Sequence, residues 1–259
     1  MGTSIIVSSG KGGVGKTNTV INLGVALTKI GKKVIVIDGS LTTPDIFLYL
    51  GIPFHVQGLS HILKGDATIE SASFTHKSGL KIIPGNIHID VLKEIKGKKF
   101  SRLLKELKRE HDFVLVDGSA GLGTETLSAV KHCDKMLVVA NPELASVVNA
   151  SKTIQISKNL NVEPLGVVLN RLGRFKPELG EEKILPLFYG IPIIGRIPED
   201  IRLPISANYS GSVLEYYPYS RTSREFLNLA YCLSGLENKR EESFFTKIKG
   251  FFQRNPKID

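Results

Sequence analysis

The sequence has little of what builds disulfide frameworks, metal clusters or membrane spans. Its 259 residues include two cysteines, Cys133 and Cys232, and neither has a C-x-x-C companion. Such sparse cysteine is typical of a protein in the reducing cytoplasm and argues against a disulfide or metal framework. No apolar run approaches the roughly 20 residues that a spanning helix needs. The first residues run straight into an expected strand, so we expect no signal peptide.

Apolar residues are plentiful and occur in short continuous runs. Hydrophobic residues make up 42% of the chain and charged residues 23%, which is ordinary for a globular protein. Continuous runs, rather than alternation, predict strands buried on both faces, as in a mainly parallel sheet between helix layers. We therefore predict an α/β, doubly wound domain over residues 1–236, ending with a helix at 220–234. The runs lie at 4–8, 34–37, 80–83, 113–116, 136–140, 165–169 and 193–197.

A glycine-rich segment follows the first of these runs. Residues 10–17 are Gly-Lys-Gly-Gly-Val-Gly-Lys-Thr and fit the phosphate-binding pattern G-x-x-x-x-G-K-[ST]. The glycines let backbone N–H groups point inward at a phosphate, Lys16 reaches the β- and γ-phosphates, and the Thr17 hydroxyl ligates Mg²⁺. The alternative is a chance glycine turn. The helix expected at 17–30 favours the phosphate loop, because a helix N-terminus attracts anions.

Two acidic residues stand where expected strands end. Asp38 follows the run at 34–37, and Asp117 follows the run at 113–116. Ligands of an open α/β sheet bind at the carboxyl ends of its strands, so these carboxylates are candidates to hold Mg²⁺ or its water ligands. The alternative for each is a strand-end Asp that caps the next turn.

The segment Lys11-Gly12-Gly13-Val14-Gly15-Lys16-Thr17 resembles the deviant Walker A motif of the MinD/ParA family of dimerising P-loop ATPases. The resemblance implies that ATP and Mg²⁺ bind here, that ATP closes a homodimer, and that Lys11 reaches the partner's nucleotide. It implies catalytic roles for Lys11, Lys16 and Asp38, and metal contacts for Thr17, Asp38 and Asp117. The implied phosphate-side contacts are Gly12, Gly13, Val14, Gly15, Lys16, Thr17 and Asn18, with Asn18 replacing the family's usual second threonine.

Further segments resemble the family's other nucleotide loops. Asp117-Gly118-Ser119-Ala120-Gly121 is similar to the second switch, with Ser119 in place of proline. It implies an amide contact from Gly121 to the γ-phosphate, since glycine allows close backbone approach. No guanine signature of the Asn/Thr-Lys-x-Asp type is present, so we expect ATP rather than GTP. The implied adenine-side contacts are Asn170, Arg171, Pro198 and Asp200.

The first switch departs from the family pattern. Family members have Asp-x-Asp after the second strand, and the second Asp is credited with orienting or activating the attacking water. Here the segment is Asp38-Gly39-Ser40. A serine hydroxyl brings no negative charge and cannot act as a carboxylate base, so we expect intact ATP binding with hydrolysis that is slow or needs a partner. Asp45 is near in sequence, which by itself does not place it at the site.

The C-terminal segment at 243–254 is amphipathic. At about 100° per residue, its large apolar side chains fall on one narrow helical face, and a polar linker at 237–242 precedes it. Such a helix lies in a membrane interface and is too short to span a bilayer; the alternative is a helix docked on the protein's own surface. The MinD branch carries such a membrane-targeting tail. The expected membrane contacts are Phe244, Phe245, Lys247, Ile248, Lys249, Phe251 and Phe252.

Positive charge is in excess. The 34 basic and 25 acidic residues give a net charge of +9, which favours an anionic partner such as nucleic acid or an acidic membrane. Much of the excess lies at 93–109, where Phe100, Leu103, Leu104 and Leu107 repeat at helical spacing. One interpretation is a solvated outer helix face; the other is a patch for lipid head groups or DNA.

These features together predict a MinD-like ATPase that dimerises on ATP and attaches reversibly to the inner face of the cell membrane. Its expected task is to position the division site or another membrane-associated assembly. Expected partners are a second copy, anionic lipids and an activating or cargo protein. Three alternatives stay open: a ParA-type partition ATPase on DNA, which the aromatic tail disfavours, a nucleotide-gated scaffold with little hydrolysis, and a regulator of surface-appendage number. The sparse cysteines weaken an iron–sulfur carrier of the same superfamily.

Overall fold

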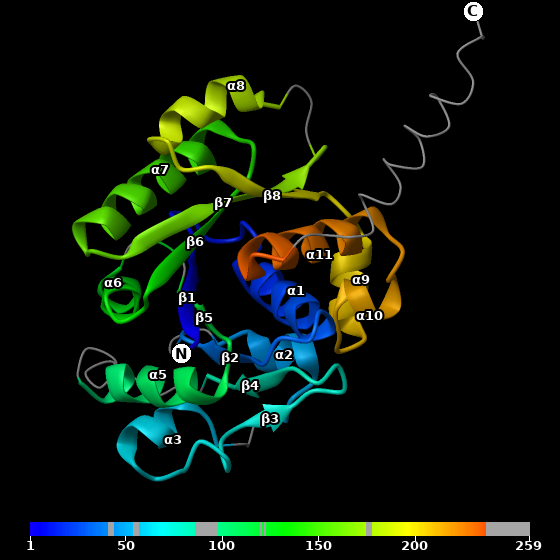
Figure 1. Cartoon of the computed structure of the whole chain (residues 1–259). Coiled ribbons are helices and arrows are strands. Elements are labelled where there is room, and N and C mark those ends of the chain that lie inside the picture. Colours follow the sequence, from blue (N-terminus) through cyan, green and yellow to red (C-terminus); the bar gives the residue numbers. More distant parts are fainter. Residues whose placement is uncertain are drawn as a thin grey trace, which may run out of the picture.

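The computed structural model describes residues 1–40, 44–53, 57–85, 98–119, 121, 123–174 and 178–236 (Figure 1). The predicted linker at 237–242 and the predicted tail helix at 243–254 lie outside these residues. Each apolar run of the sequence corresponds to a strand, so those predictions are confirmed. The strands are β1 Thr3–Ser8, β2 Val34–Asp38, β3 Phe74–Thr75, β4 Lys81–Ile83, β5 Phe113–Asp117, β6 Lys135–Ala140, β7 Glu163–Leu172 and β8 Ile193–Pro198.

The strands form one eight-stranded sheet in the order β3-β4-β2-β5-β1-β6-β7-β8. All neighbours run parallel except β3 and β4, which are antiparallel. β1 lies in the middle, with β5 on one side and β6 on the other. The predicted α/β class with a mainly parallel, doubly wound sheet is confirmed; the two-residue β3 is too short for a pattern of residues to reveal it.

Helices cover both faces of the sheet (Figure 1). One layer contains α1 and α11 and the short helices beside them, and the other contains α5, α6 and α7. Among these described helices, none combines the length and hydropathy needed to cross a bilayer. The helices are α1 Lys16–Lys29, α2 Ile46–Leu50, α3 Leu59–Lys64, α5 Lys98–Glu110, α6 Thr124–Val130, α7 Leu144–Asn159, α8 Glu181–Ile184, the 3-10 helix η2 Leu185–Phe188, α9 Arg202–Asn208, α10 Val213–Tyr216 and α11 Arg221–Ser234.

Each strand of the sheet's centre supplies side chains to two separate cores. In β1, Ile5 and Val7 pack in the α1 layer, while Ile6 packs in the α5 layer. Successive side chains of a strand point to opposite faces, so a strand buried on both sides must be apolar at every position. The continuous apolar runs in the sequence have this physical cause.

Helix α5 packs by the apolar face that the sequence predicted. Phe100, Leu103, Leu104 and Leu107 are buried, which confirms the helical spacing. Lys108 forms an ion pair with Asp134, with 2.8 Å between Nζ and Oδ2. The basic residues at 93–97 lie outside the described part of the chain, and a role of the basic face in binding lipid or DNA stays a prediction.

Parallel strands bring the loops that follow β1, β2 and β5 to one edge of the sheet. Val7 pairs with Asp117, and Asp117 pairs with Asp38. The three strand ends are therefore adjacent in space although they are separated in the sequence by as many as 110 residues (117 minus 7). Any site built at this edge draws on all three loops.

Candidate functional site

The loop between β1 and α1 has a backbone conformation that favours glycine. Gly13 and Gly15 have φ of 75° and 95°, in the left-handed region that residues with a side chain rarely enter. A Cβ at Gly15 would also meet the Asn170 amide, which would have to move to admit any other residue. The loop leads into α1 at Lys16. The free N–H groups of the first helical turn therefore face the sheet edge, as in sites that bind phosphate.

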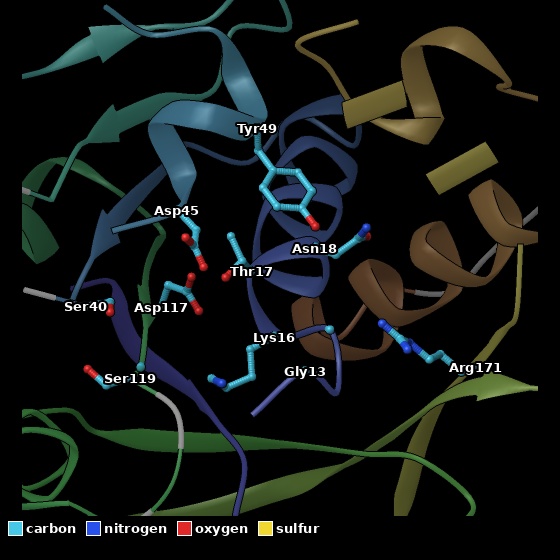
Figure 2. Close-up of a pocket in the computed structure, with 12 residues that line it drawn as sticks. Gly13, Lys16, Thr17, Asn18, Ser40, Asp45, Tyr49, Asp117, Ser119 and Arg171 are labelled. Carbon is cyan, nitrogen blue, oxygen red and sulfur yellow. The ribbon is translucent and has the colours of Figure 1, made fainter. Parts of the chain in front are cut away.

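A cavity of about 210 Å³ opens beside this loop (Figure 2). It is formed by segments far apart in the sequence: the loop with the first turn of α1, Ser40 after β2, the start and body of α2, and the ends of β5 and β7. The structure thus brings several predicted phosphate and metal residues together with others that the sequence did not assign. The lining residues are Gly13, Gly15, Lys16, Thr17, Asn18, Ser40, Asp45, Tyr49, Asp117, Gly118, Ser119 and Arg171.

Lys16 is the buried cation of the cavity. Only 8% of the residue is exposed. Burial lowers the pKa of Lys16, and the nearby carboxylates of Asp117 and Asp45 oppose that change. A buried charge is costly unless it meets opposite charge, so the phosphates of a bound nucleotide would complete the surroundings of this ammonium group.

Asp117 is the buried acid of the cavity. Burial raises the pKa of Asp117 to about 6, and the charge of Asp45 acts in the same direction. A hydrogen bond from the Thr17 hydroxyl and the charge of Lys16 oppose the increase. The carboxylate therefore stays costly to ionise until additional positive charge is supplied.

The cavity contains acceptors that no protein group satisfies. Within the described part of the chain, Oδ1 of Asp117 and the Ser119 hydroxyl oxygen are buried without a hydrogen-bond partner. Buried polar atoms in folded proteins are nearly always paired. An open carboxylate oxygen beside the Thr17 hydroxyl fits Mg²⁺, which prefers hard oxygen ligands and retains several waters.

Asp38 has a different environment from Asp117. Its Oδ1 accepts a hydrogen bond from the Ser40 N–H at 3.1 Å, and its Oδ2 accepts one from the Ile46 N–H at 3.2 Å. Burial and the charge of Asp117 raise the pKa of Asp38 well above its ordinary value, although these two hydrogen bonds oppose the shift. Asp38 is absent from the cavity lining and caps its own loop. Its predicted catalytic and metal-binding roles stay predictions.

Helix α2 brings two further side chains to the cavity. Asp45 immediately precedes the helix and Tyr49 lies four residues later, so both occupy one side of it. Figure 2 shows the Tyr49 ring reaching toward Asn18, to which its hydroxyl is hydrogen-bonded. Burial raises the pKa of Tyr49. The sequence analysis missed Tyr49 and could not place Asp45; two polar residues spaced by four in an otherwise apolar segment were the available signal.

Lys11 lies on the outer side of the glycine loop. It is exposed and lines a second cavity of about 260 Å³ with Arg171 and Arg174. Gly12 and Val14 also line this second cavity. Gly121 has φ of 81° in the loop after β5, and its predicted γ-phosphate contact stays a prediction.

The predicted adenine-side residues gather at the ends of β7 and β8. Asn170 is buried, and its Nδ2 donates a hydrogen bond to the Val14 carbonyl oxygen at 2.7 Å. Arg171 lines both cavities. Pro198 ends β8 opposite Leu172. The lining of the cavity in Figure 2 does not include Asn170, Pro198 or Asp200, and their contact with the base stays a prediction.

Asp200 has local partners. Its Oδ2 accepts a hydrogen bond from the Thr222 hydroxyl at 2.5 Å, and its Oδ1 accepts one from the Arg202 N–H at 3.0 Å. The side chain therefore joins the loop after β8 to α9 and α11. This leaves the backbone of the loop as the part that can line a bound base.

Comparison with known proteins shows which family this chain resembles. Residues 1–233 match the family described as ParA, NUBPL iron-transfer P-loop NTPase. An uncharacterized ATP-binding protein of Methanocaldococcus jannaschii is 34% identical, over 98% of each chain. The septum site-determining protein MinD of Pyrococcus horikoshii, solved in complex with Mg-ADP, superposes with a TM-score of 0.82 at 32% identity, covering 89% of this chain and 95% of that one.

A further similar structure contains a partner protein. The MinC:MinD cell division protein complex of Aquifex aeolicus has a chain that superposes with a TM-score of 0.78 at 30% identity, covering 91% of this chain and 97% of that one. The match to the family covers nearly all of the described residues, including every loop of the cavity. The chain therefore belongs to the ParA/MinD family of P-loop NTPases and is an ATP-binding member of it.

Proposed function

We propose that this protein is a MinD-like ATPase that binds ATP with Mg²⁺, dimerises on ATP and attaches reversibly to the membrane. The observation that carries the nucleotide part is the cavity in which the glycine loop, buried Lys16 and the unpartnered oxygen of Asp117 meet. Similarity to a MinD structure that contains Mg-ADP supports the same class of ligand here. Hydrolysis to ADP and phosphate is slow or partner-stimulated, because Ser40 stands where the family has a second Asp.

The parts of Mg-ATP have separate partners in the proposed complex. The Thr17 hydroxyl and the Asp117 carboxylate hold the ion directly or through water. The loop N–H groups and Lys16 hold the phosphates, and the ends of β7 and β8 border the base. When bound, the ion neutralises charge that develops on the phosphates.

The exposed side of the glycine loop supports an ATP-dependent homodimer. Lys11, Arg171 and Arg174 line one cavity there, with Glu143 as the acid among its lining residues. Several cations around one cavity favour an incoming anion. In the proposed dimer, the phosphates of the partner's ATP approach Lys11. Because this contact requires bound ATP, the nucleotide controls whether the homodimer forms.

The proposed membrane-binding segment is residues 243–254, and the basis for it is their amphipathic sequence. Five large apolar side chains contribute about 1 kcal/mol each when half-buried. Each of the three basic residues Lys247, Lys249 and Arg254 adds about 1 kcal/mol on anionic lipid, and ordering so short a helix opposes binding. One tail therefore binds weakly, whereas two tails on an ATP-held dimer gain on the order of a hundredfold in avidity.

The proposed task is spatial positioning at the cytoplasmic face of the membrane. The assembly positioned is the division site or another membrane-associated complex, brought by an activating or cargo protein. The Aquifex aeolicus complex of MinC with MinD supports the ability of this fold to carry a protein partner.

Co-sedimentation with anionic liposomes tests the proposal. We expect the full chain to pellet with ATP and to remain largely in the supernatant with ADP. A Phe251→Ser, Phe252→Ser variant should lose pelleting, while the matched Gln253→Ser change on the opposite helical face should not. Equal pelleting with ATP and ADP would refute nucleotide control, and no pelleting in either state would refute membrane attachment.

A chain ended at Leu236 separates the two parts of the proposal. It should bind ATP with the affinity of the full chain and stay in the supernatant with liposomes, because the tail is proposed to act only at the membrane. Loss of ATP binding on truncation would mean that residues after 236 belong to the folded domain.

A DNA-partition function is the second candidate, favoured by the exposed cations of α5. Arg102, Lys105 and Arg109 are exposed on the face away from its buried leucines. ATP-dependent binding to random-sequence duplex DNA, with a steep salt dependence, would favour this candidate over the membrane.

The description of the matched family includes iron transfer, and this chain has two cysteines, of which Cys232 is exposed. Cys133 is buried, and burial raises the pKa of the Cys133 thiol. Metal ligation requires the thiolate, and burial disfavours the thiolate form of Cys133.

A further inference from the structure

Asp45 occupies a position that compensates for Ser40. The cavity of Figure 2 has two acidic residues in its lining, Asp117 and Asp45. We propose that Asp45 is the carboxylate that orients and deprotonates the attacking water in this chain. The inference rests on the ATP hydrolysis proposed above and identifies the residue that makes it possible without an acid at position 40.

The placement of Asp45 is the first support. Figure 2 shows its carboxylate directed into the space beside Thr17 and Asp117. Asp45, Lys16 and Asp117 line the same cavity, so Asp45 shares the site with the phosphate-binding lysine.

The helix beside Asp45 leaves its carboxylate available. Asp45 is the N-cap residue of α2, where an Asp side chain ordinarily accepts an N–H of the first turn, yet it makes no capping hydrogen bond. Asp38 accepts the N–H of Ile46 instead. With that first amide satisfied from β2, the Asp45 side chain extends into the cavity rather than onto its own helix.

Asp45 and Asp117 differ in exposure, and the difference separates their roles. Asp117 is 2% exposed and already bonded to Thr17, on the side where a metal is expected. Asp45 is exposed, so water reaches it from solvent. In the proposed step the water oxygen bonds to the γ-phosphorus as the bond to the ADP oxygen breaks. The water's proton passes to Asp45 and from there to solvent, and ADP and phosphate leave.

The variant Asp45→Asn tests the proposal, because the amide keeps the shape and cannot take the proton. We expect phosphate release to fall about 100-fold, the usual scale for a lost general base. ATP affinity and its Mg²⁺ dependence, measured with a fluorescent ATP analogue, should be unchanged. ATP-bound dimer should accumulate in sedimentation velocity. Asp66→Asn, a surface change on the turn after α3, is the matched control and should behave as wild type.

Restoring the family's acid gives a second arm. Ser40→Asp added to Asp45→Asn should recover most of the lost phosphate release, since Ser40 lines the same cavity. Wild-type turnover in Asp45→Asn would overturn the role of Asp45. Loss of Mg²⁺-dependent ATP binding would overturn it in favour of metal ligation. A wild-type chain that binds ATP and releases no phosphate, alone or with liposomes, would refute the proposed hydrolysis itself.

Discussion

Each edge of the sheet has an acid beside a central strand, and the two acids differ in exposure and in hydrogen bonding: the Asp134 side chain is 41% exposed, whereas Asp117 is 2% exposed. At the amino edge, Asp134 precedes β6 and accepts hydrogen bonds from the Ser4 N–H at 2.9 Å, the Ser4 hydroxyl at 2.8 Å and Lys108 Nζ at 2.8 Å. At the carboxyl edge, Asp117 ends β5 with Oδ1 buried and unpartnered. Both acids flank central strands of one sheet, and only one of them is satisfied by the protein.

The pKa values move accordingly. Burial raises the pKa of both acids, but at Asp134 the hydrogen bonds from Lys108 and Ser4 outweigh burial, and its pKa falls below the ordinary value. At Asp117 burial prevails, and the pKa is raised to about 6. A satisfied acid stabilises the fold, whereas an unsatisfied one destabilises the empty protein and is available to a ligand. The comparison therefore separates structural acids from functional ones without reference to any relative.

Removing the charge of Asp117 should have the largest effect. We expect Asp117→Asn to lower Mg²⁺-dependent ATP turnover by about 100-fold or more, because a metal contact worth several kcal/mol is lost. The same change should raise the free energy of unfolding of the nucleotide-free protein at pH 7.5. The pKa difference from the ordinary 3.8 corresponds to at most about 3 kcal/mol at 1.36 kcal/mol per unit. Phosphate release and urea unfolding measure the two effects, and a destabilised variant would contradict the comparison.

The stability of the nucleotide-free protein should depend on pH in the direction set by Asp117. A carboxyl group with a raised pKa binds more protons in the folded state, so the contribution of Asp117 to stability falls as pH rises from about 4 to about 6 and is constant above that. Urea unfolding between pH 4 and pH 8 measures this slope. Asp117→Asn should reduce the slope and leave the part due to Asp38, whose pKa is raised well above its ordinary value. An unchanged slope in the variant would assign the effect to other groups.

Asp134→Asn should have the smallest effect and the opposite sign. Its hydrogen bonds are charge-assisted but partly exposed, so we expect a loss of about 1 kcal/mol in the free energy of unfolding. Because the pKa of Asp134 is lowered, the stabilisation is present at neutral pH and disappears as pH falls below about 4. ATP affinity should be unchanged, and a large loss of ATP binding would show that the amino edge is coupled to the site.

The parts of the described fold that could be predicted from the sequence are those indicated by short, local residue patterns. Continuous apolar runs predicted the central strands, and the glycine loop predicted the phosphate site, because burial on both faces and left-handed backbone each demand particular residues. The short helix α2 was missed, since five residues carry no periodicity. Because helix α2 was not predicted, Tyr49 was not identified as a site residue and the location of Asp45 could not be predicted.

Two acids that look alike in the sequence ended in different environments. Asp38 and Asp117 both close a buried strand, and the sequence supported the same metal role and the same capping alternative for each. In the structure Asp38 caps its loop while Asp117 faces the cavity. The choice depends on which backbone N–H groups come within reach, and for Asp38 these are the N–H groups of Ser40 and Ile46, which lie outside both strands.

The sequence by itself determined the parallel sheet, the phosphate loop and the identity of Lys16 and Thr17 as its chemical groups, because these depend on residue type at fixed spacing. Tertiary structure alone decided which acids enter the cavity, that Asn170 braces the loop carbonyl of Val14, and that Asp45 lies beside Asp117. These contacts are between residues dozens of positions apart in the sequence. They depend on the register of the sheet strands and on the direction of the short helix α2. No local pattern encodes them, since they arise only when the strands pair.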